Sequence, residues 1–154
     1  MKKTLIVLLA LCLMAMAFTG CAPKAETAEY DIDKMALKIK DSGAFSDMLS
    51  PIDTSIVPTL YGANASDIED VVVLCSTGAT TEEIAIFKCI DSEAAERLVS
   101  AAEERIISQK NLYGSYAPAE PPKLDEAIVK ADGIYVFYIV SVNSAKVQAV
   151  LEGK

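Results

Sequence analysis

The chain has 154 residues, of which 22 are acidic and 14 basic, giving a formal net charge of −8, and it contains no histidine. Without histidine, Ser-His and Cys-His hydrolases are excluded and the commonest metal ligand is missing. No basic cluster suited to displacing counterions from phosphates follows the first 20 residues, so a nucleic-acid partner is not expected.

Residues 1–20 have the pattern of a bacterial export signal. Lys2 and Lys3 form its charged n-region, and an apolar run of about fourteen residues, 5–18, forms its h-region. This run is shorter than the roughly 20 residues that cross a bilayer as a helix. We therefore predict a signal peptide over residues 1–20 and no spanning helix in the mature protein.

Cys21 follows Gly20, the small residue at the expected cleavage point, as in the lipobox of bacterial lipoproteins. Phe18 departs from the usual lipobox, which carries leucine there. A diacylglyceryl group on Cys21 would place at least two acyl chains in the membrane, and two chains give stable anchoring. The alternative is an ordinary secretory signal in which Cys21 is coincidental. We predict a palmitate-type lipid on Cys21 at the extracytoplasmic face of the cell membrane.

Cleavage removes two lysines and no acids, so the formal charge changes from −8 to −10. Residues 22–29 are small, polar and unpatterned, which is typical of a flexible tether. We therefore expect a lipidated cysteine and tether over residues 21–30 and a single domain over residues 31–154.

Residues 30–42 are predicted to form a helix, capped by Asp31 or Asp33 and ended by Gly43. Residues 52–61 contain a proline and are expected to be irregular. Residues 66–69 have the spacing of a capping box for one helical turn.

Residues 71–76 and 83–90 are rich in β-branched side chains and are predicted to form a hairpin around residues 77–80. In that hairpin Cys75 faces residues 82–85, whereas Cys89 faces residues 68–71. Exported compartments permit disulfides, but this pairing favours two buried thiols that act as small apolar residues. Whether they are ever oxidised stays open.

Asp91 or Ser92 is predicted to cap a long helix, whose apolar stripe recurs at helical spacing through Ala95, Leu98 and Ala102. Residues 116–122 hold three prolines and are expected to form an exposed or partly extended loop.

A second hairpin is predicted between residues 127–131 and 134–141, because Asp132-Gly133 favours a type I′ turn. Val129 should then oppose Val136, and Ile128 should oppose Phe137. Asn143 or Ser144 is predicted to cap a closing helix.

The order α–β–β–α–β–β–α predicts an α+β fold. Two hairpins joined by a long helix indicate a single antiparallel sheet, with the helices packed on one face. About 124 residues suffice for one domain with one core.

Residues 83–88 read E-I-A-I-F-K, which resembles the E-I-A-x-F-K strand of an uncharacterised family of short bacterial lipoproteins, classed as a domain of unknown function. The similarity covers roughly residues 31–147. It continues through the following positions: Arg105, Gln109, Tyr116, Pro118, Gly133 and Tyr135.

The chain departs from the family pattern at Cys89, where an apolar residue is usual, and at Ser144, where aspartate is usual. The first departure bears on packing and the second on a helix cap. The resemblance implies an exported lipoprotein domain with no known catalytic activity, and it transfers no site.

Three carboxylate pairs are candidates for the acid–base pair of a glycosidase, which needs two carboxylates about 5–10 Å apart: Glu82/Glu83, Asp91/Glu93 and Asp125/Glu126. Each pair also suits a strand end, a helix cap or a solvated turn, so enzymatic activity and a cofactor are not expected. Two acidic runs, at residues 31–33 and 67–70, lack the frame of a calcium loop, so no metal site is expected.

Tyr113, Tyr116 and Tyr135 are the candidate binding residues, because tyrosine makes low-entropy contact surfaces for polypeptide or sugar ligands. The competing interpretation places Tyr113 in the core and leaves Tyr116 to fix a proline-rich loop. Lys88 and Arg105 are expected to form salt bridges with neighbouring glutamates.

These features predict a non-enzymatic envelope lipoprotein that binds a protein or envelope component. The expected contact surface is the loop over residues 113–122 together with the hairpin edge around Tyr135. An alternative is a small-ligand-binding accessory lipoprotein of a transport system, which needs a concave apolar pocket. A carboxylate-only hydrolase is the third hypothesis.

Overall fold

A computed structural model describes residues 29–154. The predicted signal peptide, the lipidation of Cys21 and most of the tether lie outside the described residues. No helix within residues 29–154 is both long and apolar enough to cross a bilayer.

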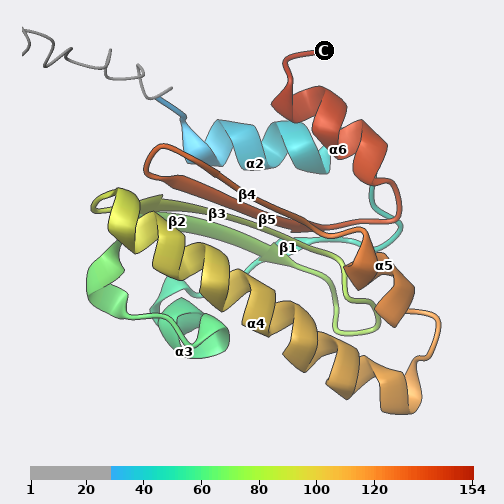
Figure 1. Ribbon diagram of the computed structural model, residues 1–154. Coiled ribbons are helices and arrows are strands. Elements are labelled where there is room, and N and C mark those ends of the chain that lie inside the picture. The colour runs from blue at the N-terminus through green and yellow to red at the C-terminus, as the bar shows by residue number, and fades with distance from the viewer. Residues whose placement is uncertain (1–28) are drawn as a thin grey trace, which may run out of the picture.

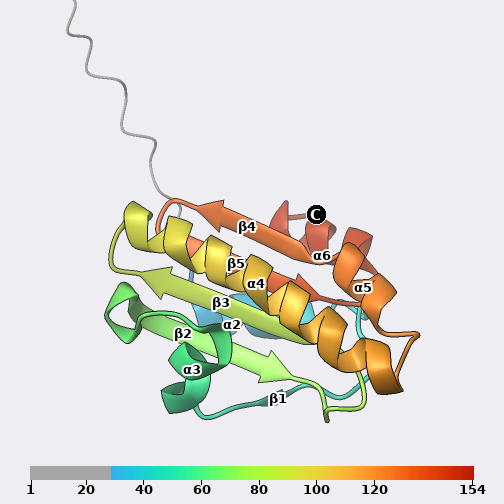
Figure 2. The same cartoon turned by 60° about the horizontal axis from the view of Figure 1, so that its bottom comes forward.

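The centre of the fold is a five-stranded antiparallel sheet, with the spatial order β1-β2-β3-β5-β4 (Figure 2). The strands are β1 (Ser50–Pro51), β2 (Ile68–Cys75), β3 (Glu83–Cys89), β4 (Ile128–Asp132) and β5 (Tyr135–Val140). The central strands β3 and β5 pair with each other from Glu83 opposite Val140 to Lys88 opposite Tyr135. The predicted α+β class with a single antiparallel sheet is confirmed.

Helices cover both faces of this sheet (Figure 1). The long α4 (Ser92–Tyr116) and the short α3 (Val57–Tyr61) lie on one face, whereas α2 (Ile32–Lys40) and α6 (Ser144–Leu151) lie on the other. The fifth helix, α5 (Pro121–Asp125), follows α4 at the end of the sheet and adds Leu124 to the core on the α4 side.

The prediction of helices on one face was wrong, and β3 and β5 show why. All six residues of β5 are buried, and six of the seven residues of β3 are buried. Phe87 and Tyr138 pack in the core under α4, whereas Ile86 and Phe137 pack in the core under α2 and α6. A sheet with two apolar faces needs cover on both.

The first hairpin has the predicted register. Cys75 pairs with Glu83, and Cys89 pairs with Ile68, so the two cysteines lie at opposite ends of the hairpin. Both are free thiols, half-buried at Cys75 and buried at Cys89. Desolvation raises the pKa of the Cys75 thiol to about 12 and that of Cys89 to about 11, which makes both poor nucleophiles at neutral pH.

The second hairpin forms, but its register differs from the prediction by two residues. Asp132 pairs with Tyr135, and Val129 opposes Tyr138 instead of Val136. The two loop residues are therefore Gly133 and Ile134, and only Gly133 has a positive φ, of 62°. This pattern matches a type II′ turn, with glycine first, and not the type I′ turn. A two-residue shift keeps every side chain on its predicted face.

Two connecting segments are more helical than predicted. The segment expected to be irregular forms a 3-10 turn, Thr54–Ile56, and then α3. Residues 116–122 are not one loop, because α4 continues to Tyr116 and α5 begins at Pro121. In α3 and α5 proline occupies the first turn, where its missing N–H is not needed.

The caps are of the predicted kind at three helices and differ at one turn. Asp31, Asp91 and Asn143 cap α2, α4 and α6 through their side-chain oxygens. The expected capping box at residues 66–69 does not form. A 3-10 turn, Ala65–Asp67, is capped instead by Asn64, and β2 begins directly after it.

Candidate functional site

Two neighbouring carboxylates are buried where β3 begins. Glu82 and Glu83 are only 1% and 2% exposed. Burying a charge is unfavourable unless it is paired and hydrogen-bonded, so the partners of these two side chains define the local structure. The partners differ completely between the two residues.

Glu83 is held from the α4 side of the sheet by a guanidinium fork. Arg105 donates from Nη2 at 2.7 Å and from Nε at 3.1 Å to the Glu83 carboxylate, and the Tyr61 hydroxyl donates to it at 2.5 Å. Burial alone would lower the pKa of Arg105, but the Glu83 carboxylate raises it above its ordinary value. This charge-assisted contact joins α3 and α4 to the sheet.

Tyr138 lies beside this ion pair. Its hydroxyl is buried and has no hydrogen-bond partner within the described residues. Desolvation, reinforced by the Glu83 charge, raises the pKa of Tyr138 above its ordinary value. The hydroxyl therefore stays neutral at physiological pH.

Glu82 is held by backbone amides and a lysine. The N–H groups of Ser46 and Asp47 donate to it at 2.8 and 3.1 Å, the Ser46 hydroxyl also donates, and Lys123 Nζ lies at 3.1 Å. Lys123 is shared with Glu120, at 2.9 Å. Desolvation opposes ionisation of Glu82, but these donors outweigh it and lower the pKa of the carboxyl.

The β2–β3 loop is fixed by contacts from three other segments. Glu120 accepts the Thr81 N–H at 2.9 Å, and Asp47 accepts the Thr77 hydroxyl at 3.0 Å. The Tyr113 hydroxyl, on α4, donates to the carbonyl oxygens of Thr80 and Gly78 at 2.8 and 3.2 Å. These contacts hold the loop in one conformation.

Exposed apolar side chains neighbour the residues that fix this loop. Met48 is 70% exposed, Leu112 58% and Tyr116 55%. Met48 directly follows Asp47, whose carboxylate accepts a hydrogen bond from Thr77 in the loop. The ring centroid of Tyr116 lies 5.1 Å from that of Tyr113, whose hydroxyl also contacts the loop. We call this the loop-end surface, consisting of Met48, Thr77, Gly78, Leu112 and Tyr116.

The structure brings together two of the three predicted binding tyrosines. Tyr113 and Tyr116 lie side by side near the end of α4, with Tyr113 buried against the loop. Tyr135 is 3% exposed and packs on Tyr30 at 5.1 Å, on the opposite face of the sheet and at its other end. Tyr135 therefore does not share a surface with the other two.

The carboxylate pairs also have separate environments. Glu82 and Glu83 bind different cations, so they do not converge on a shared partner. Asp91 caps α4, and Asp125 pairs with Lys110 at 2.6 Å on the surface. Within residues 29–154 no group of three or more Cys, Asp or Glu side chains is placed to hold a metal ion.

Sequence reasoning did not find Glu120 and Lys123 as members of this site. Glu120 lies in the segment that was expected to be a loop, and Lys123 directly follows that segment. They reach the β2–β3 loop from 39 and 41 residues away. The expected pairing of Arg105 and Lys88 with glutamates does occur, with Glu83 and Glu69 respectively.

These features define the class of domain. It is an antiparallel sheet covered by helices on both faces, with a β2–β3 loop that is fixed by buried ion pairs. Residues 41–141 match the family described as "Domain of unknown function (DUF4358)". The chain belongs to this family, as its E-I-A-x-F-K strand predicted. No curated protein and no solved structure matches the chain.

Proposed function

We propose that this protein is a non-enzymatic interaction module. In this proposal a lipid on Cys21 holds it at the extracytoplasmic face of the cell membrane, and the loop-end surface binds a protein partner. The observation that carries the proposal is the combination of exposed apolar side chains with a loop that the buried Glu82 and Glu120 hold in place.

The loop-end surface lies at the end of the domain opposite to the start of the described chain (Figure 1). Tyr30 donates a hydrogen bond to Asp132 at 2.5 Å, beside the β4–β5 turn. Along β3, that end is marked by Lys88 opposite Tyr135, and the loop end by Glu83 opposite Val140. About 17 Å of strand separates the two ends. A tether at residue 29 would therefore direct the loop-end surface away from the membrane.

A loop fixed in advance supports binding. Because the loop already has one conformation, a partner would not have to order it, and ordering would otherwise weaken the affinity. Tyr116 adds an exposed aromatic side chain with a polar end, a type enriched among residues that dominate binding energy.

Site-specific photocrosslinking in living cells tests the partner surface. A photoreactive amino acid replaces Tyr116 in one strain and Ile90 in the other. Ile90 is the matched control because it is 53% exposed but follows β3 at the opposite end. We expect a discrete crosslinked protein at position 116 and none at position 90. Equal adducts at both positions, or none at 116, would contradict the proposed surface.

Metabolic labelling with palmitate tests the anchor separately. The natural chain should incorporate label and sediment with membranes, whereas Cys21→Ser should do neither. A Cys21→Ser variant that still sediments with membranes would contradict the lipid anchor.

A further inference from the structure

The two edges of the sheet differ in how they are protected. The edge strand β1 has only two residues, and one of them is Pro51. A short edge with a proline resists pairing with another chain. The other edge strand, β4, has five residues and no proline. One edge of the sheet is therefore protected against pairing with another strand, whereas the other edge is not.

The β4–β5 turn determines which backbone groups of β4 are free. Asp132 and Tyr135 flank a two-residue loop, so they form the hydrogen-bonded pair that closes it. Antiparallel pairs alternate between bonded and non-bonded, which leaves the N–H and C=O groups of Val129 and Ala131 directed outward. Beyond the sheet ladder, no backbone hydrogen bond within residues 29–154 involves these groups.

An open groove runs beside this edge. It has a volume of about 510 Å³ and lies between Ile128 and Lys130 of β4 and Gln148 and Leu151 of α6. A second groove, of about 470 Å³, adjoins it near α5 and shares Glu126 and Ser144. Together they give an incoming chain space for side chains alongside the free backbone groups.

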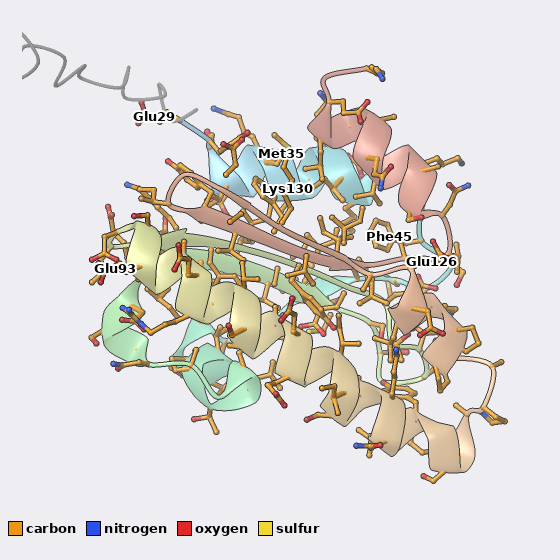
Figure 3. The ribbon with its side chains drawn as sticks, in the orientation of Figure 1. Glu29, Met35, Phe45, Glu93, Glu126 and Lys130 are labelled. Atoms are coloured by element: carbon orange, nitrogen blue, oxygen red, sulfur yellow. The ribbon has the colours of Figure 1, made fainter. Side chains whose placement is uncertain are left out.

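Charges at the two ends of the groove indicate what kind of chain fits. Glu126 lies next to α5, and Lys130 lies on the α2 side of the sheet (Figure 3). Both side chains are exposed, and neither belongs to any of the ion pairs found within residues 29–154. Lys130 is the third residue of β4, whereas Glu126 is the C-cap of α5 and precedes the strand by two residues. A segment paired with β4 would meet both charges if it carried an acidic residue opposite Lys130 and a basic residue about four positions further along, beyond the start of β4.

We infer that β4 binds an extended segment of a partner protein, which adds to the sheet as a sixth, antiparallel strand. An acidic side chain of the segment pairs with Lys130 and a basic one pairs with Glu126. Main-chain hydrogen bonds to Val129 and Ala131 supply the part of the affinity that does not depend on the sequence of the segment. Side-chain contacts in the groove supply specificity. A second copy of this chain is a less suitable occupant, because it carries the same net charge of −8. This inference does not depend on the loop-end surface or on the lipid anchor.

A synthetic peptide tests the inference on the full chain in detergent. The probe is acetyl-Thr-Glu-Val-Thr-Val-Lys-Thr-amide, and binding is followed by the amide resonances of ¹⁵N-labelled protein. We expect the largest shifts at Val129 and Ala131 and slower hydrogen exchange at both amides. Shifts confined to other parts of the chain would overturn the inference.

Two N-methylated peptides separate strand addition from simple charge attraction. One carries N-methyl groups on the odd-numbered residues and the other on the even-numbered residues, so the charges are identical. A strand pairs through only one of its edges, so one peptide should lose at least about tenfold in affinity and the other should bind like the parent. Equal affinity of the two peptides would overturn the inference.

Replacing Ala131 by proline gives the reciprocal test on the protein. Ala131→Pro removes an outward N–H and should weaken peptide binding about tenfold, whereas the matched control Ala131→Ser should bind within about twofold. If Ala131→Pro unfolds, the N-methylated peptides decide the question. Self-association of the peptide-free chain through the Val129 and Ala131 amides would overturn the inference in favour of a second copy.

Discussion

Glu82 and Glu83 are neighbours in the chain and are buried to the same degree, yet their charges are balanced in different ways. Glu83 is bound by the planar fork of Arg105, which is itself 10% exposed, inside the core under α4. Glu82 is bound mainly by two backbone amides and by Lys123, at the border of the loop. The first arrangement attaches a helix to the sheet, and the second fixes a loop. The comparison shows that burial alone does not tell what a buried charge does.

Arg105→Leu should have the largest effect. Removing one partner of a buried pair leaves an uncompensated charge, so we expect a loss of about 3–5 kcal/mol in the free energy of unfolding. Urea denaturation followed by circular dichroism measures this loss. A loss below about 1 kcal/mol would show that Glu83 is solvated or neutral in the folded protein.

The double variant Glu83→Met with Arg105→Leu is the control for that measurement. Because both charges are then absent, most of the lost stability should return. If the double variant is as unstable as Arg105→Leu, the loss comes from packing and not from the orphaned carboxylate.

Glu82→Gln should have a smaller and more local effect. The amide keeps an acceptor for one backbone N–H, but it loses the charge that binds Lys123, so we expect a loss of about 1–3 kcal/mol. Hydrogen exchange should accelerate at Ser46 and Asp47 and stay unchanged in the middle of α4. Uniform acceleration across the domain would mean that Glu82 supports the whole core as Glu83 does.

Acid should weaken the Glu82 site progressively. The fold lowers the pKa of Glu82 and Glu120 below the ordinary value of 4.5. Their stabilisation is therefore complete above about pH 4.5 and is lost as the pH falls through the lowered values. Urea midpoints measured from pH 7 to pH 3 should decrease below pH 4.5, and less steeply in Lys123→Met. Identical slopes in the two proteins would exclude Lys123 as a cause.

Lys88→Ala should have the smallest effect. Lys88 pairs with Glu69 at 2.6 Å, but both side chains remain solvent-accessible, at 31% and 50%. Exposed pairs of this kind contribute little, so the urea midpoint should stay within the error of the measurement. A clear shift of the midpoint would show that this exposed pair contributes to the stability of the fold as the buried pairs do.

Local signals in the sequence were sufficient for most of the secondary structure. Asp31, Asp91 and Asn143 precede apolar helical stripes, and all three cap helices. The first hairpin was predicted in register because its loop is clearly polar. The turn of the second hairpin was misplaced because Asp132-Gly133 and Gly133-Ile134 both satisfy a two-residue turn, and only the pairing of the whole strand distinguishes them.

The site and the second layer of helices depend on contacts between distant residues. Glu83 and Arg105 are 22 residues apart, and Glu82 and Lys123 are 41 apart. The periodicity of apolar residues in a sequence does not indicate which residues so far apart make contact. The sequence did mark β3 and β5 as continuous apolar runs, which favours a sheet covered on both faces, and this was the available sign that helices on one face would not suffice.

Because β3 and β5 contribute alternate side chains to two cores, neither core can melt while the other survives. Loosening Phe87 on one side displaces the backbone that also positions Ile86 on the other. The domain should therefore lose its structure in one cooperative step, and the most slowly exchanging amides of α2 and α4 should share the same opening free energy.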